Sequence, residues 1–228
     1  MRQIIDCFKN HSLVFLLTAG TLFSFYWIVQ FRQKIRIKWY MALILAVMHT
    51  LAGVFTVKAF AFMETGFNTD SLGNMSLFGG VFFMPLFYYA GARITRCNVS
   101  DVFDIFTVCM IGTVMCARIN CILTGCCKGI SFFGSSRMHW PTREIEILYY
   151  LVMLALLIPK VKEGAFVGKA YPVYMLSYGI LRFCIEWVRY YSGGTWIHPA
   201  HIWAIVSLCL GLSFYVELNK PKQKQRRR

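Results

Sequence analysis

Four polar residues recur within one apolar stretch in the last quarter of the chain. Tyr178, Arg182, Glu186 and Arg189 are spaced by four, four and three residues. This spacing places all of them on one face of a helix, over about three turns. An arginine guanidinium is a planar fork that binds phosphate or carboxylate oxygens. The stripe is therefore either the lining of a cavity for such a ligand or an Arg–Glu pair that neutralises itself. The second arginine and the tyrosine favour the cavity, because a self-neutralised pair needs neither.

A second motif, ARINCILTGCCKG at 117–129, ends a long apolar stretch. Arg118 is a further candidate phosphate ligand. Gly125 and Gly129 allow the backbone to approach a lipid headgroup and to leave the helical conformation. The motif also contains three cysteines and one lysine: Cys121, Cys126, Cys127 and Lys128.

These cysteines admit three interpretations. They are soft metal ligands by type, but the two CxxC pairs typical of a thiolate metal site do not occur, so the sequence predicts no metal. Cys126 or Cys127 could be a nucleophile if Lys128 lowers its pKa. A packing role is the third interpretation, and it is favoured for each cysteine taken alone.

Other polar residues also lie within apolar stretches. A charge at the centre of a membrane helix costs about 2.5–3.5 kcal/mol on insertion scales, so Lys58 and Asp104 are expected to face the protein interior, together with His49. Asp101 is expected to cap or complement the start of its helix. The pair His198 and His201 is expected to form surface hydrogen bonds rather than act as bases.

The composition indicates the elements that position these residues. Of the 228 residues, 57% are hydrophobic and only 15% are charged. A soluble domain would carry more charge, so much of the apolar surface must meet lipid. Spanning a bilayer takes about 20 apolar residues per helix. We therefore expect an all-α, polytopic integral membrane protein in one domain (1–228), with seven transmembrane helices at 12–31, 39–62, 76–93, 101–125, 143–160, 168–190 and 199–219.

The positions of the charges predict the orientation. The net charge is +14, and the basic residues cluster on every second connection and in the tail at 220–228. Basic connections remain on the cytoplasmic side, which predicts an outside N-terminus and a cytoplasmic C-terminus. The loop at 126–142 then lies outside, where it could cap a site. Because topology and the anionic lipid surface account for the basic charge, no nucleic-acid partner is expected.

At this point the sequence resembles the prolipoprotein diacylglyceryl transferase family. The resemblance rests on five stretches in the family's order: SLFGGVFFMPLFYYAGARITR, DVFDIFTVCMIGTVMCARINCILTG, WPTREIE, SYGILRFCIEWVR and PAHIW. They cover residues 76 to about 205. The chain departs from the family at Phe78, where the family has a histidine before Gly79 and Gly80, and at Cys121 and Cys126, which replace Asn and Glu.

The resemblance implies a reaction without metal or cofactor at the outer face of a bacterial cell membrane. The family transfers diacylglyceryl from phosphatidylglycerol to the lipobox cysteine of a prolipoprotein. By the same resemblance, the catalytic residues are Arg118, Tyr178, Arg182 and Glu186, and the substrate-binding residues are Gly79, Gly80, Arg118, Gly129, Arg182 and Arg189. Two alternatives remain open: a divergent paralogue that uses another acceptor, and a non-catalytic phospholipid-binding membrane protein.

Overall fold

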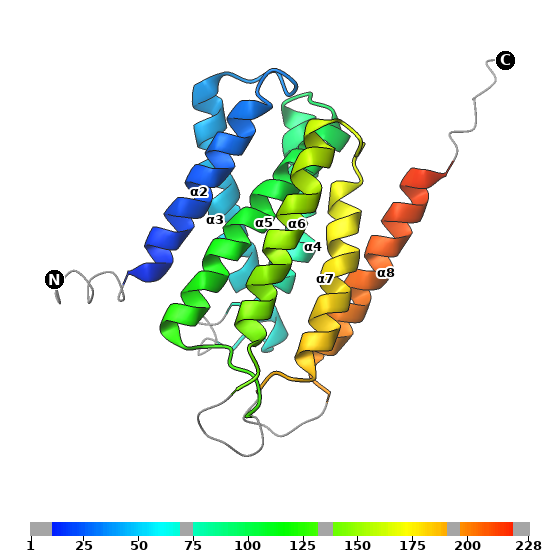
Figure 1. The fold of residues 1–228 in the computed structure, drawn as a ribbon. Coiled ribbons are helices and arrows are strands. Elements are labelled where there is room, and N and C mark those ends of the chain that lie inside the picture. Colours follow the sequence, from blue (N-terminus) through cyan, green and yellow to red (C-terminus); the bar gives the residue numbers. More distant parts are fainter. Residues whose placement is uncertain (1–10, 69–74, 132–138, 191–196, 221–228) are drawn as a thin grey trace.

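The computed structural model describes residues 11–68, 75–131, 139–190 and 197–220, and within them every long element is a helix. Successive helices run in opposite directions along the bundle (Figure 1). Each of the seven predicted stretches forms a helix. The helices are α2 (Ser12–Gln30), α3 (Trp39–Glu64), α4 (Phe78–Ile94), α5 (Val99–Thr124), α6 (Thr142–Lys162), α7 (Ala170–Glu186) and α8 (Pro199–Asn219).

Four of these helices, α2, α3, α5 and α8, are long and apolar enough to cross a membrane. By comparison, α4 and α7 have only 17 residues each, and α6 carries charged residues in its first and last turns. The expected all-helical membrane protein is confirmed at this level, with four candidate spans among the described residues.

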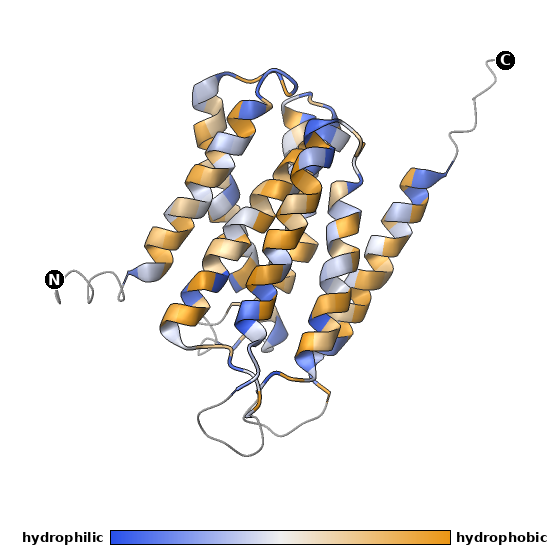
Figure 2. Cartoon of the chain, viewed as in Figure 1, coloured by the Kyte–Doolittle hydropathy of each residue, from blue (hydrophilic) through white to orange (hydrophobic). Residues whose placement is uncertain are grey.

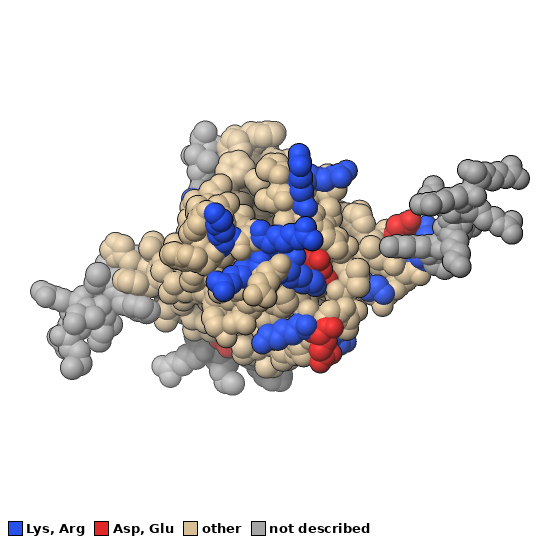
Figure 3. All heavy atoms as spheres, turned by 90° about the horizontal axis from the view of Figure 1, so that it is seen from above, with Lys and Arg blue, Asp and Glu red and all other residues tan. Residues whose placement is uncertain are grey.

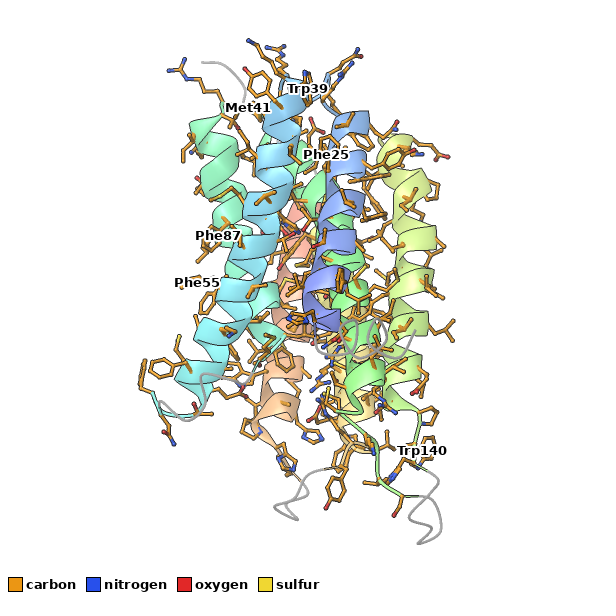
Figure 4. The ribbon with its side chains drawn as sticks, turned by 90° about the vertical axis from the view of Figure 1, so that its left-hand side faces the viewer. Phe25, Trp39, Met41, Phe55, Phe87 and Trp140 are labelled. Carbon is orange, nitrogen blue, oxygen red and sulfur yellow. The ribbon has the colours of Figure 1, made fainter. Side chains whose placement is uncertain are left out.

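The outside of the bundle has the character of a lipid-facing surface. Apolar residues cover the flanks of the helices, and hydrophilic residues collect near their ends (Figure 2). Large apolar side chains such as Leu51 and Phe55 on α3 are more than half exposed. Trp39 and Trp140 mark opposite ends of the molecule (Figure 4). Tryptophan is enriched at both membrane–water interfaces, so these two residues fit a bundle that spans the bilayer.

Helix α5 is the centre of the bundle. It packs against α2, α4, α6 and α7, and residues 104–112 are buried without interruption. Close approach to α2 depends on small residues, because a Cβ atom at Gly112 would lie 2.3 Å from the Phe23 ring. Glycine at helix contacts is the usual device for tight packing in membranes.

The buried Asp104 of α5 holds the start of α7. Its carboxylate accepts hydrogen bonds from the backbone N–H groups of Gly168 (2.8 Å) and Ala170 (3.0 Å). The expectation that Asp104 faces the interior is confirmed. Asp101 lies in the first turn of α5 as expected and pairs with Lys34 at 2.8 Å, whereas the N-cap itself is Asn98.

The expectation for Lys58 was wrong. This residue is exposed on the flank of α3, within two turns of the end of that helix. A lysine near a helix end can extend its long side chain to the membrane interface, so it needs no interior partner. His49 is buried, as expected.

Candidate functional site

Four charged residues from three helices form a continuous ion-pair network inside the bundle. Arg118 Nε lies 2.7 Å from Glu146 Oε2, and Arg182 Nη1 lies 2.9 Å from Glu146 Oε1. Arg182 Nη2 lies 3.0 Å from Glu186 Oε2. All four residues are at most 7% exposed. The charges alternate in sign along the network, which makes their burial tolerable.

The ends of three helices bring the network together. Arg118 lies in the last two turns of α5, and Glu146 lies in the second turn of α6. Arg182 and Glu186 are one turn apart at the end of α7. These three helix ends lie at the end of the bundle opposite the basic connections (Figure 1). The site is therefore built at one end of the molecule, below its surface.

Glu146 is the member of this network that sequence reasoning did not single out. It is the last residue of WPTREIE, a stretch already noted for its resemblance, and this was the available signal. Helical spacing placed Arg182 and Glu186 on one face and left their pairing open as an alternative, but it could not reveal a partner on another helix. Among the described residues, Glu146 is the one carboxylate that both arginines share.

The two arginines use their guanidinium groups differently. Both terminal nitrogens of Arg182 are occupied by Glu146 and Glu186. Arg118 meets Glu146 through Nε, and no described carboxylate is paired with its terminal nitrogens. Arg118 therefore retains the pair of donors that can bind a phosphate in the plane of the fork.

Tyr178 and Phe78 form the wall beside Arg182. The two rings are 5.7 Å apart, and the Arg182 guanidinium lies 5.9 Å from the Phe78 ring. Position 78, where the family has a histidine, thus belongs to the site. The Tyr178 hydroxyl is buried and has no hydrogen-bond partner among the described residues, and the same is true of the Tyr150 hydroxyl. Buried hydroxyls normally have a partner, so these two are exceptions among the described residues.

Arg189 does not belong to the helical stripe, contrary to expectation. α7 ends at Glu186, and the chain then runs beside the loop after α5, with Gly129 opposite Arg189. Backbone hydrogen bonds from Ile130 to Val188 (2.8 Å) and from Tyr190 to Lys128 (3.1 Å) hold the two segments together. Arg189 is thereby placed near the loop that carries Cys126 and Cys127, called the cysteine loop below, rather than in line with Arg182.

Two of the three predicted glycines have clear packing roles. A Cβ atom at Gly79 would lie 2.1 Å from the Thr56 carbonyl oxygen, so this glycine allows α4 to touch α3. A Cβ atom at Gly129 would lie 2.5 Å from the Cβ of Trp140. Gly80 is different, because its nearest neighbour would be Val57 Cγ1 at 3.7 Å.

The cysteine loop follows directly on α5. Gly125 ends the helix in the left-handed conformation, as expected, and Cys127 also has a positive φ of 56°. A hydrogen bond with the Cys121 thiol lowers the pKa of Cys127 to about 4; burial opposes this effect, and the charges of Arg189 and Arg118 reinforce it. Lys128, the expected cause, is not the source of this shift.

The histidines lie outside the network. His198 and His201 form a capping box at the start of α8, and the His198 N–H donates to His201 Nδ1 at 3.1 Å. Their expected hydrogen-bonding role is confirmed, although His201 is buried rather than on the surface. His49 lines a separate cavity.

That cavity is an apolar groove of about 580 Å³ that is open to the outside of the bundle; it lies mainly between α3 and α4 and extends to Ile37 and Cys97 at the basic end. Its walls include Leu51, Phe55, Met84 and Phe87, while the four charged residues lie outside it. Phe55 and Phe87 project from α3 and α4 on the same side of the bundle (Figure 4). Pockets of this size and polarity suit an apolar ligand.

A comparison with protein families agrees with the five stretches. Residues 16–217 match the family model described as prolipoprotein diacylglyceryl transferase, which covers most of the chain. No curated protein matches the sequence.

Proposed function

The chain belongs to the prolipoprotein diacylglyceryl transferase family, and from this premise we propose that it transfers diacylglyceryl from phosphatidylglycerol to a prolipoprotein cysteine. The family implies lipoprotein diacylglyceryl transfer in general. The donor, the acceptor and the location at the outer face of a bacterial cell membrane are part of the proposal. So are the seven spans and the outside N-terminus.

The proposed step is a displacement at carbon. The acceptor thiolate attacks the glycerol carbon that carries the phosphate ester, a C–S bond forms, and the C–O bond breaks. The electron pair of that bond leaves with glycerol 1-phosphate, and the thiol proton passes to solvent. Because a thiol has an unperturbed pKa of about 8.5, a few per cent of it is already ionised near neutral pH. The reaction therefore needs no strong base at Phe78.

The observation that carries the proposal is the buried network with one uncommitted arginine fork. Arg118 directs its terminal nitrogens to the phosphate and stabilises the charge on the leaving oxygen. Arg182 is held by Glu146 and Glu186, so it positions the network and adds positive charge. The orphaned Tyr178 hydroxyl donates to a phosphate oxygen, and Arg189 contributes a further charge beside the loop.

The apolar cavity supports a lipid donor. A diacyl lipid whose headgroup lies at Arg118 must place two acyl chains along the bundle, and the 580 Å³ space between α3 and α4 accepts apolar chains. Gly79 and Gly80 lie on α4 between this cavity and the network, since Phe78 lies beside Arg182 and Met84 lines the cavity.

The test is direct. Purified protein in detergent is incubated with phosphatidylglycerol and a lipobox peptide, and the peptide is weighed by mass spectrometry. We expect the peptide to gain a diacylglyceryl group. Arg118→Lys keeps the charge but loses the fork, and we expect a loss of turnover of about 100-fold. Arg93→Lys, at the opposite end of the bundle, is the matched control and should remain active.

Two other outcomes assign the protein differently. Transfer to a small thiol but not to the peptide would identify a paralogue with another acceptor. The specific observation in favour of this second function is Phe78. This residue replaces the family's histidine beside Arg182, so no side chain at this position can accept or donate a proton. Phosphatidylglycerol that binds but is never consumed would identify a phospholipid-binding protein.

A further inference from the structure

The sulfur atoms of Cys121, Cys126 and Cys127 lie within 4.8 Å of one another. The spacing of these cysteines in the sequence predicted no metal. The structure brings the sulfurs together because Cys121 lies in the last turn of α5 and the chain then reverses through two left-handed residues, Gly125 and Cys127. A left-handed non-glycine residue is strained, and it persists where the surrounding structure holds it.

The loop is held from several directions. Thr142 Oγ1 donates to the Cys127 carbonyl oxygen at 3.0 Å, and Arg143 Nη1 donates to the Cys121 carbonyl oxygen at 3.2 Å. Thr124 Oγ1 lies 3.4 Å from Cys126 Sγ. The first turn of α6 and the last turn of α5 therefore fix the backbone and one of the sulfurs before any ligand arrives.

We propose that Cys121, Cys126 and Cys127 form a three-thiolate site for a soft metal ion, such as Zn²⁺ or Cu⁺. Metal–sulfur bonds of about 2.3 Å require sulfurs about 3.8–4.0 Å apart, so side-chain adjustments of about 1 Å complete the site. Thiolates are the ligands that soft ions prefer. Each sulfur binds the ion as a thiolate, and any proton that it still carries passes to solvent.

The surrounding charges match the complex. Three thiolates around Zn²⁺ give a net charge of −1, and around Cu⁺ a net charge of −2. Arg118 lies one turn before Cys121, and the charges of Arg118 and Arg189 act on the Cys127 sulfur. An anionic metal–thiolate complex is stabilised in such surroundings, whereas a hard cation held by oxygen ligands would not be. Cys126 is exposed, which gives the ion a path into the site.

The experiment measures binding of the metal alone, independently of any transfer activity. Reduced protein in detergent is titrated anaerobically with Cd²⁺, a spectroscopic substitute for Zn²⁺, and the thiolate-to-metal absorption is followed. Bound metal per chain is measured by elemental analysis after gel filtration. We expect one ion per chain. Cys126→Ser, at an exposed position, should weaken binding by about tenfold or more, and the triple Cys121→Ser, Cys126→Ser, Cys127→Ser variant should abolish it.

The matched control is the double Cys184→Ser, Cys209→Ser variant, which removes two exposed cysteines outside the cluster and should bind as the parent does. Helical circular dichroism and gel filtration confirm that each variant is folded. Undiminished binding by folded Cys126→Ser protein would overturn the proposal. Failure of the reduced parent protein to bind Cd²⁺ would also overturn it. This holds even if the mass of the parent before reduction reveals a disulfide among the three cysteines.

Discussion

The shared carboxylate of Glu146 decides how the buried charges are arranged. One of its oxygens forms an ion pair with Arg118 Nε at 2.7 Å, and the other accepts a hydrogen bond from Arg182 Nη1 at 2.9 Å. Without it, two guanidinium groups would face each other with Glu186 as their remaining carboxylate in the network. Breaking a buried ion pair by removing one partner leaves an uncompensated charge, which costs about 3–5 kcal/mol.

Glu146→Gln should therefore destabilise the protein by about 3–5 kcal/mol, seen as a large fall in the unfolding temperature in detergent. Glu144→Gln is the matched control, because Glu144 is two residues away, about half exposed, and 3.7 Å from Arg143. Exposed pairs contribute about 0–1 kcal/mol, so this variant should unfold close to the parent. Equal effects of the two substitutions would show that the network does not depend on Glu146.

At this scale the sequence predicted the residue types of the site better than their partners. The four-residue spacing placed Arg182 and Glu186 on one helical face and offered their pairing as the less favoured alternative, and that pair is present. Glu146 and Arg118 come from different helices, and helical periodicity carries no information on contacts between helices. The cysteine cluster was missed for another reason. Its geometry depends on the left-handed Cys127, and a cysteine gives no signal for that conformation.

At the scale of the helices, the contact between α3 and α4 depends on the absence of a side chain at Gly79. The backbone of α3 occupies the space in which a side chain would lie, with the Thr56 carbonyl oxygen closest. Gly80 has no such neighbour, although it is next in the chain. The resemblance assigns both glycines to substrate binding, so the two positions can separate packing from binding.

Gly79→Ala should push α4 away from α3 and cost about 1–3 kcal/mol, as overpacked cores do. Gly80→Ala meets ordinary contact distances and should be neutral or stabilise the helix by about 0.5–1 kcal/mol. Thermal unfolding of the two variants in the same detergent checks this contrast. A Gly80→Ala variant that is stable but inactive would support a substrate contact at Gly80, whereas a Gly79→Ala variant as stable as the parent would contradict the packing role.

Among the helices, the end of α7 is the boundary that the sequence predicted least well. Apolar and polar periodicity continues to Arg189, and the next glycines are Gly193 and Gly194, so nothing local marks an end at Glu186. The helix ends there because residues 188–190 form backbone hydrogen bonds with the loop at 128–130. A tertiary contact therefore determines this boundary.

For the whole molecule, the basic connections gather at one end. Figure 3 views this end and shows lysine and arginine side chains spread over it. Of the exposed basic residues at this end, Arg32, Arg36 and Arg96 belong to two connections, and Lys162 is the last residue of α6. The alternation of charge along the sequence predicted this gathering. The orientation relative to the membrane remains a prediction from the positive-inside rule.

Cysteines introduced at Asn68 and at Glu163 should lie on opposite sides of the membrane. Both positions are exposed, after α3 and after α6 respectively. In intact cells, a membrane-impermeant maleimide should label the variant with Cys in place of Asn68 above the parent background. The variant with Cys in place of Glu163 should react after the cells are opened. Labelling of both variants in intact cells would contradict the seven-span arrangement.

The capping of α7 by Asp104 has a consequence for biogenesis. Asp104 and its two backbone partners are separated by more than sixty residues, and α6 is synthesised between them. As helices leave the translocon in order, α5 enters the bilayer with a buried carboxylate that has not yet met the start of α7. An unpartnered acid inside a membrane is costly, so we expect the packing around Asp104 to be completed only after residue 170 has been inserted.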